Sequence, residues 1–303
     1  MSDRPQTIAV LSVAVLASAW AAPLIRLSSA PPPALAAWRV IIAVLVLAPV
    51  FFLGAGFKEW RAQPARDRRL TAAAGAALAL HFATWISSVR LTSVAASIVL
   101  VDLSPIFTWV LSWWFLKERP GPRQGAGIVI AVMGAVVIAS GDAGRGGGHA
   151  LIGDALALTG ALCGAVYFVL GRHLRARLGL VAYIAPVYGV AAALLLIWAA
   201  SKGQISGPFA SRDWLIFAAL AVGPTLIGHS GQNYALRHLA AFAVGAAMLA
   251  EPVGSTIIAW VLPSIGERPP AATLAGGAVC LLGIALTLAR GGSEPPHVPS
   301  SGF

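Results

Sequence analysis

The sequence contains little charge, few cysteines and few lysines. Charged residues make up 11% of the 303 residues, against roughly 25% in an ordinary soluble domain. Cys163 and Cys280 are the only cysteines and do not form a CxxC pair, so neither a disulfide framework nor a zinc site is indicated. None of the lysines, Lys58, Lys117 and Lys202, lies inside an apolar run, which argues against a retinal-type receptor with a mid-span lysine.

Several sequence motifs of enzymes are absent as well. The chain has no P-loop, no HExxH, no GxSxG and no pair of aspartates in a GxGD context. These motifs supply phosphate binding, a zinc site or an activated nucleophile. Their absence disfavours an intramembrane enzyme and a direct coupling to ATP. We therefore expect no catalytic residue, no metal and no cofactor.

Most of the sequence is apolar. Hydrophobic residues make up 58% of the chain, and the mean hydropathy is +0.81. A soluble fold has too little interior to bury so much apolar surface, whereas a bilayer acts as an apolar solvent that a helix of about 20 residues can cross. The sequence therefore predicts an all-α integral membrane protein. Its ten predicted spans cover residues 7–27, 34–54, 70–90, 94–115, 124–141, 151–171, 180–200, 213–236, 240–262 and 271–290.

The basic residues lie mainly between the apolar runs. The net charge is +10, and 14 of the 21 lysines and arginines fall in segments predicted on the same side of the membrane as the N-terminus. Because cytoplasmic loops carry an excess of positive charge, both termini are predicted to be cytoplasmic. Basic loops that face an anionic leaflet explain the charge without nucleic acid as a partner.

The two halves of the chain resemble each other. The turn Lys117–Pro120 before the fifth span matches Gly266–Pro269 before the tenth at an offset of 149, and Pro105 matches Pro252 at 147. Each half holds five spans, an odd number, so the second half must enter the membrane from the opposite face. We therefore predict two inverted repeats around a central cavity. The repeats are expected over residues 1–145 and 146–290, followed by a disordered tail over 291–303.

Charged residues inside a span need a physical reason, because a charge at the bilayer centre costs roughly 2.5–3.5 kcal/mol on insertion scales. Asp102 and Glu251 lie well inside their spans, where they could carry a proton or bind a substrate ammonium. The alternative is a protonated acid that is hydrogen-bonded within the bundle. Pro105 and Pro252 are candidate hinges for alternating access, with passive bending of the helix as the alternative.

Spans three and eight each carry a polar and aromatic stripe at helical spacing, and spans one and six add aromatic residues. Such faces could line a polar cavity on whose walls a flat substrate could stack. The alternative for each residue is an ordinary contact between helices. The candidate substrate-binding residues are Trp20, His81, Trp85, Ser88, Tyr167, His229, Gln232 and Asn233.

The repeated unit resembles the drug/metabolite transporter superfamily. The shared features are a proline in the fourth helix, a Glu-Arg-Pro turn and a glycine-rich fifth helix, and the ten-helix branch with two EamA-type domains fits best over about residues 7–290. The resemblance implies export of amino acids or related metabolites across the bacterial inner membrane, through a cavity lined mainly by helices one, three, four, six, eight and nine. Glu251-Pro252 matches a Glu-Pro pair common in the family, whereas the fourth span has Ser104-Pro105.

We therefore expect a transporter that exports small metabolites, in particular aromatic or neutral amino acids, by alternating access without ATP. A carrier of drugs, nucleotide-sugars or lipids with the same fold is the alternative, and it would need a groove open to lipid or a larger basic pocket. The expected partners are a small-molecule substrate and the lipid bilayer. Spans five and ten contain no proline and no acid, which suits them to helix packing or to contact with a second copy of the chain in a homo-oligomer.

Overall fold

The computed structural model describes residues 4–92, 94–118, 121–140, 150–262 and 271–289. All regular structure in these ranges is helical. The predicted tail over 291–303 and the second Glu-Arg-Pro turn at Glu267 lie outside the described residues. The helices are α1 (Arg4–Ser18), α2 (Ala21–Leu27), α3 (Pro32–Leu53), α4 (Gly56–Arg61), α5 (Ala65–Leu91), α6 (Val94–Val101), α7 (Ser104–Leu111), η1 (Ser112–Leu116), α8 (Pro122–Ser140), α9 (Ala150–Arg175), α10 (Leu180–Ser201), α11 (Ser211–Leu220), η2 (Ala221–His229), α12 (Ser230–Ala235), α13 (Ala241–Met248), α14 (Glu251–Val261) and α15 (Ala271–Leu288), of which η1 and η2 are π-helical.

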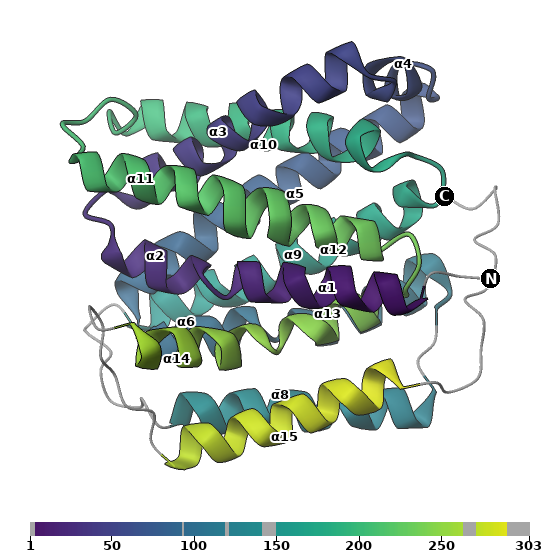
Figure 1. The fold of residues 1–303 in the computed structure, drawn as a ribbon, viewed down its shortest axis with the longest axis vertical. Helices are drawn as coiled ribbons and strands as arrows, with labels where there is room; N and C mark the ends of the chain where they lie inside the picture. Colours follow the sequence, from purple (N-terminus) through teal and green to yellow (C-terminus); the bar gives the residue numbers. More distant parts are fainter. Residues whose placement is uncertain (1–3, 93, 119–120, 141–149, 263–270, 290–303) are drawn as a thin grey trace.

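The helices lie side by side in a layered bundle, with α3, α10 and α11 toward one end of the long axis and the pair α8 and α15 at the other (Figure 1). Within the described ranges, seven helical stretches are long and apolar enough to cross a membrane, and they correspond to predicted spans one to three and six to nine. The apolar stretches of α8 and α15 are shorter, and the predicted span over 94–115 is divided into α6, α7 and η1. The protein is thus helical with multiple apolar helices, and the count of ten spans stays a prediction.

Three helices are interrupted four or five residues before a proline. The residue four positions before Pro105 is Val101, where α6 ends, and the residue four positions before Pro252 is Met248, where α13 ends. A proline has no amide hydrogen to donate to the carbonyl four residues earlier, and its ring clashes with that carbonyl. Pro23 follows the break between α1 and α2, and here the first helix ends five positions earlier, at Ser18. The sequence predicts bends at these prolines, and the structure has full interruptions.

At two of these breaks, a backbone carbonyl accepts a hydrogen bond from a side chain of another helix. The hydroxyl of Ser255 donates to the carbonyl oxygen of Ala19 at 2.7 Å. The thiol of Cys280 donates to the carbonyl oxygen of Leu249 at 2.9 Å. Broken helices are tolerated at membrane depth when neighbouring side chains satisfy the backbone in this way. The breaks are therefore stable parts of the fold.

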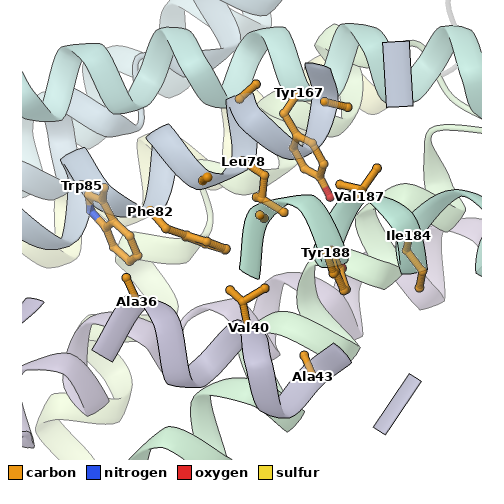
Figure 2. Packing of buried hydrophobic residues seen from close by; sticks show 14 of the residues in the cluster. Ala36, Val40, Ala43, Leu78, Phe82, Trp85, Tyr167, Ile184, Val187 and Tyr188 are labelled. Carbon is orange, nitrogen blue, oxygen red and sulfur yellow. The ribbon is translucent and has the colours of Figure 1, made fainter. Parts of the chain in front are cut away.

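The centre of the bundle is packed from α3, α5 and α10. Leu78 and Phe82 of α5 face the small residues Ala36 and Val40 of α3, and Tyr188 enters from α10 (Figure 2). Hydrophobic burial does not drive helices together inside a bilayer, because the lipid is as apolar as the side chains. Close packing of small against large residues supplies the attraction instead. This packing holds one wall of the central site in place.

Helices α8 and α15 pack through glycine. A Cβ added at Gly127 would lie 2.7 Å from the carbonyl oxygen of Gly283, and one added at Gly134 would lie 2.7 Å from that of Gly276. Ordinary Cβ contacts begin at 3.4 Å, so only glycine permits this approach of the two backbones. Because the earlier glycine of α8 meets the later glycine of α15, the two helices run antiparallel.

One end of the bundle is held by a buried ion pair, which we call the Arg172 network. Arg172 donates its Nε to Glu118 Oε1 at 2.7 Å, and both side chains are at most 5% exposed. Arg172 also donates to the carbonyl oxygens of Leu236 and Arg237, while Glu118 accepts the amide of Ala241 at 3.1 Å. The network joins the end of α9 and the segment after η1 to the link between α12 and α13.

Candidate functional site

A cavity lies between the broken helices near the middle of the bundle. Its volume is about 70 Å³ for the centres of water-sized molecules, whereas one water needs about 10–15 Å³ by that measure. The residues that line it come from α1, α2, α3, α5, α6, α7, α9, η2, α12, α13 and α14. In predicted spans these are one, two, three, four, six, eight and nine. The centre is therefore hollow, and its lining agrees with the helices that the resemblance implies, with span two added.

The cavity wall contains several buried polar atoms without a hydrogen-bond partner. Within the described part of the chain, five lining residues carry such an atom. A buried polar group that lacks a partner costs about 1–3 kcal/mol, so each such atom needs an explanation in a native structure. Their gathering around one cavity indicates a site that binds a polar ligand. The atoms are Arg39 Nη1, Trp85 Nε1, Asp102 Oδ2, His229 Nδ1 and Gln232 Oε1.

Arg39 is the cation of the cavity wall, and its side chain is held from two directions. Its Nε and Nη2 donate to the hydroxyl oxygen of Thr225 at 3.2 and 3.1 Å. Its guanidinium carbon lies 4.2 Å from the centroid of the Phe82 ring, a cation–π contact. The residue is only 1% exposed. A guanidinium stays charged in proteins, so this positive charge is fixed at the edge of the cavity.

The π-helical segment η2 places the groups that face Arg39 and the cavity. The hydroxyl of Thr225 donates to the carbonyl oxygen of Leu220, five residues earlier, at 2.9 Å, and the carbonyl of Thr225 accepts from Tyr188. The Thr225 hydroxyl thus has its one donor and both acceptor positions in use. π-Helical turns occur often at functional sites. Here the turn presents one hydroxyl to Arg39 and His229 to the cavity.

Two acids reach the cavity at the helix breaks. Asp102 directly follows α6 and is 8% exposed, while Glu251 is the first residue of α14. The amide groups at a helix N-terminus have no helical partners and attract negative charge, which makes the starts of α7 and α14 favourable places for these acids. The two carboxyl groups are close enough to interact electrostatically. They form an acidic side of the cavity.

Aromatic rings form a further part of the wall. The rings of His81 and Trp85 are stacked with centroids 6.1 Å apart, and the ring of His229 meets those of Phe82 and Tyr167 edge-on at 5.1 and 6.0 Å. His81 Nδ1 lies 2.9 Å from the carbonyl oxygen of Gly160. A carbonyl only accepts, so Nδ1 carries the hydrogen and the neutral ring has its Nε2 free to accept. This wall suits an apolar or aromatic group of a ligand.

The structure brings most of the predicted site residues together and leaves three elsewhere. Trp20 does not line the cavity, and its side chain is 40% exposed. Ser88 donates to the carbonyl of Trp85 and shares a hydrogen bond with Ser97. Asn233 donates to the Tyr167 hydroxyl and to the carbonyl of His229, and so supports two lining residues from behind. The predicted residues that line the cavity are His81, Trp85, Asp102, Tyr167, His229, Gln232 and Glu251.

Sequence reasoning misses several lining residues, above all Arg39. Arg39 lies within predicted span two, and a charge inside a span is itself a signal of function. The hydroxyl-bearing residues Ser18, Ser104 and Ser255 give no comparable signal. Across the described ranges, no group of three His, Cys, Asp or Glu side chains is arranged to hold a metal ion. The hinge candidates Pro105 and Pro252 lie in the first turns of α7 and α14.

Comparison with known proteins assigns the family. The EamA-like transporter family matches residues 6–140 and again 151–289, and solute carrier family 35 matches the shorter stretch 84–206. A protein of Streptantibioticus cattleyicolor named "probable terminal-alkyne amino-acid exporter" is 30% identical over 283 residues, 91% of each chain. An uncharacterized transporter of Archaeoglobus fulgidus is 26% identical over 86% of this chain and 89% of its own. A crystal structure with 23% identity superposes with a TM-score of 0.79 over 94% of this chain and 98% of that one, and so shares the fold. The chain therefore belongs to the EamA-like transporter family, and it is a multi-pass membrane transporter.

Proposed function

We propose that the protein exports neutral amino acids with aromatic or branched apolar side chains across the bacterial inner membrane, by alternating access and without ATP. The observation that carries this proposal is a buried cavity with an acidic side and an aromatic wall. Asp102 and Glu251 suit a substrate ammonium, and the rings of His81, Trp85 and Tyr167 suit an apolar side chain. The similarity to a protein named as an amino-acid exporter supports the same substrate class.

The proposal includes two inverted repeats, and the contact between α8 and α15 supports it. Gly127 and Gly134 match Gly276 and Gly283 at an offset of 149. Gly127 packs against Gly283, and Gly134 packs against Gly276. Each glycine thus meets the counterpart of the other, which is the pattern of an isologous contact around a two-fold axis. Helices of equivalent position in two upside-down copies would meet in this way.

The matching breaks also support the repeats. The interruption at 102–103 and the interruption at 249–250 are related by the offset of 147 that relates Pro105 to Pro252. Broken helices at a midplane site are typical of transporters built from inverted repeats. We propose that α7 and α14 change their angle at these breaks when the cavity opens to one side or the other. The repeats would then extend over 1–145 and 146–290.

The described ends of the chain lie together. Arg4, at the start of α1, donates its Nη2 to the carbonyl oxygen of Leu288 in α15 at 2.9 Å. Two ends on one side agree with an even number of crossings. Together with the excess of positive charge in the segments of that side, this contact supports our proposal that both termini are cytoplasmic.

A counterflow assay tests the proposed function. Purified protein in liposomes preloaded with unlabelled L-phenylalanine or L-leucine should accumulate the labelled amino acid transiently, with no nucleotide present. The double variant Asp102→Asn/Glu251→Gln should lose most of this activity. The variant Asp154→Asn should keep it, because this carboxylate bonds Thr92 away from the cavity. A requirement for ATP, or movement of drugs or nucleotide-sugars but of no amino acid, would contradict the proposal.

A further inference from the structure

Arg39 stands out among the buried arginines of the described helices. Arg172 and Arg175 are 4% and 2% exposed, and both point their nitrogens at protein acceptors: Arg172 at Glu118 and two carbonyls, Arg175 at the carbonyls of Asn233 and Leu178. Arg39 is as deeply buried, but its Nη1 finds no acceptor among the described residues. Neither Arg172 nor Arg175 has a buried nitrogen without an acceptor, so Arg39 differs from the arginines that serve packing alone.

We propose that Arg39 binds the carboxylate of the substrate, so that the transporter selects compounds with a free carboxylate over amides and amines of the same skeleton. This inference rests on the proposed function, because it assigns one end of an amino acid to one side chain. It adds a residue that determines specificity. It also requires a free carboxylate on the substrate, which the acids and the aromatic wall do not require.

The geometry around Arg39 fixes the guanidinium without neutralising it. Thr225 holds Nε and Nη2, and Phe82 covers one face of the group. Both partners are uncharged. In the described part of the structure neither Asp102 nor Glu251 lies within 4.0 Å of it as an ion pair, although Glu251 is close enough to interact electrostatically. Among the described residues, none neutralises the positive charge of Arg39 by an ion pair or accepts a hydrogen bond from its Nη1.

Cation and acids line one cavity without pairing, and this separation matches a zwitterion. A carboxylate at Arg39 would gain charge-assisted hydrogen bonds in a site of low dielectric. The adjacent ammonium would then lie on the side of Asp102 and Glu251. Hydroxyl-bearing Ser18 and the amide of Gln232, which donates to Ser18 at 3.1 Å, complete the polar part of the wall.

Only the first of the two proposed repeats has an arginine at this position. His81 and His229, at an offset of 148, both line the cavity, so this pair of positions is filled alike in the two halves. At offsets of 146 to 148 from Arg39 the second half has Ala185, Pro186 and Val187. Of the described residues that line the cavity, Arg39 is the only lysine or arginine. The site should therefore accept one carboxylate in one orientation.

The test compares competitors in the L-phenylalanine counterflow assay. For the wild-type protein, L-phenylalaninamide and phenethylamine should compete at least about tenfold more weakly than L-phenylalanine, because a charge-assisted hydrogen bond contributes a factor of about 10–100. In Arg39→Gln the ratio between L-phenylalanine and its amide should fall toward one, and in Arg39→Lys it should be partly retained. The exposed Arg212→Gln should keep the wild-type ratio.

The outcomes separate this inference from the proposed function. If the wild-type protein transports amino acids but binds the amide as well as the acid, or if Arg39→Gln keeps the wild-type ratio, the assignment of Arg39 is overturned and the export proposal stands. If the wild-type protein moves no amino acid, both are overturned. Should Arg39→Gln fail to fold, Thr225→Val tests the same assignment. Because this variant removes the hydroxyl that holds the Arg39 guanidinium in place, it should lower the ratio between L-phenylalanine and its amide. An unchanged ratio would count against the assignment.

Discussion

Replacing Gly283 by alanine tests how closely α8 and α15 approach. The added Cβ would lie 2.6 Å from the carbonyl oxygen of Gly127, 2.7 Å from the Cα of Ala131 and closer still to the amide nitrogen of Ala131. All three are backbone atoms, so no side chain can turn away to make room. To bring even the Gly127 oxygen to an ordinary contact of 3.4 Å, the two backbones must separate by about 0.8 Å, the difference between 3.4 and 2.6 Å, and the Ala131 nitrogen requires more.

The cost of this separation can be bounded. A gap of 0.5–1 Å removes roughly a quarter to a half of the dispersion energy of each contact across it. Overpacking of this kind destabilises a protein by about 1–3 kcal/mol. On the scaling for soluble chains, each kcal/mol lowers the midpoint of thermal unfolding by about 2–4 °C. We therefore expect a decrease of about 2–12 °C, measured by the loss of the monodisperse peak in size-exclusion chromatography after heating.

A second glycine provides the matched control. Gly189 lies inside α10, and no described atom would come within 4 Å of a Cβ added there. Gly189→Ala should leave the midpoint unchanged or raise it, because alanine favours a helix over glycine by about 0.5–1 kcal/mol. Gly134→Ala, at the repeat-related position in α8, should behave like Gly283→Ala. If Gly283→Ala and Gly189→Ala unfold at the same temperature, the close approach of α8 and α15 is refuted.

Two further predictions concern the acids. In the wild-type protein, substrate binding should weaken as the pH falls and the Glu251 carboxylate takes up a proton, since only the carboxylate attracts an ammonium. Glu251→Gln should show a flatter pH profile of counterflow, and an unchanged profile would remove this residue as a proton site. Glu118→Gln should lower the midpoint of thermal unfolding strongly, because removing one partner of a buried ion pair costs about 3–5 kcal/mol. Asp67→Asn breaks an ion pair whose arginine is 39% exposed, and should cost about 0–1 kcal/mol. Equal decreases of the midpoint in the two variants would contradict a special role of the Arg172 network.

Composition and periodicity are sufficient to predict the helical membrane class and seven of the 18 residues that line the cavity. His229 and Gln232 share a helix face by spacing alone, and a regular helix brings both to the same side. Asp102 and Glu251 can be found because an acid in an apolar span is costly. These signals are local, so a single sequence carries them.

The predicted residues that lie away from the cavity, and the lining residue that the sequence analysis misses, depend on tertiary contacts. Trp20 falls in the break between α1 and α2, where helical spacing no longer fixes the direction of a side chain. Ser88 keeps the spacing of its stripe but finds Ser97 as a partner from α6. In the sequence, Arg39 is one of the basic residues counted on the side of the membrane opposite the N-terminus. Only the packing of α3 against α5 and η2 brings it to Thr225 and the cavity.

The wide turn at η2 has a consequence for the register of everything that follows it. A π-helical turn closes its hydrogen bond over five residues rather than four, so one additional residue is accommodated before α12 begins. A regular α-helix rotates by about 100° per residue. If the same residues were wound as a regular α-helix, His229 and Gln232 would turn by about a quarter of a turn, away from the hollow, whereas deleting one residue within 221–224 would restore regular winding and leave their direction unchanged. The winding of this one helix, as much as its amino acids, thus determines which side chains face a ligand.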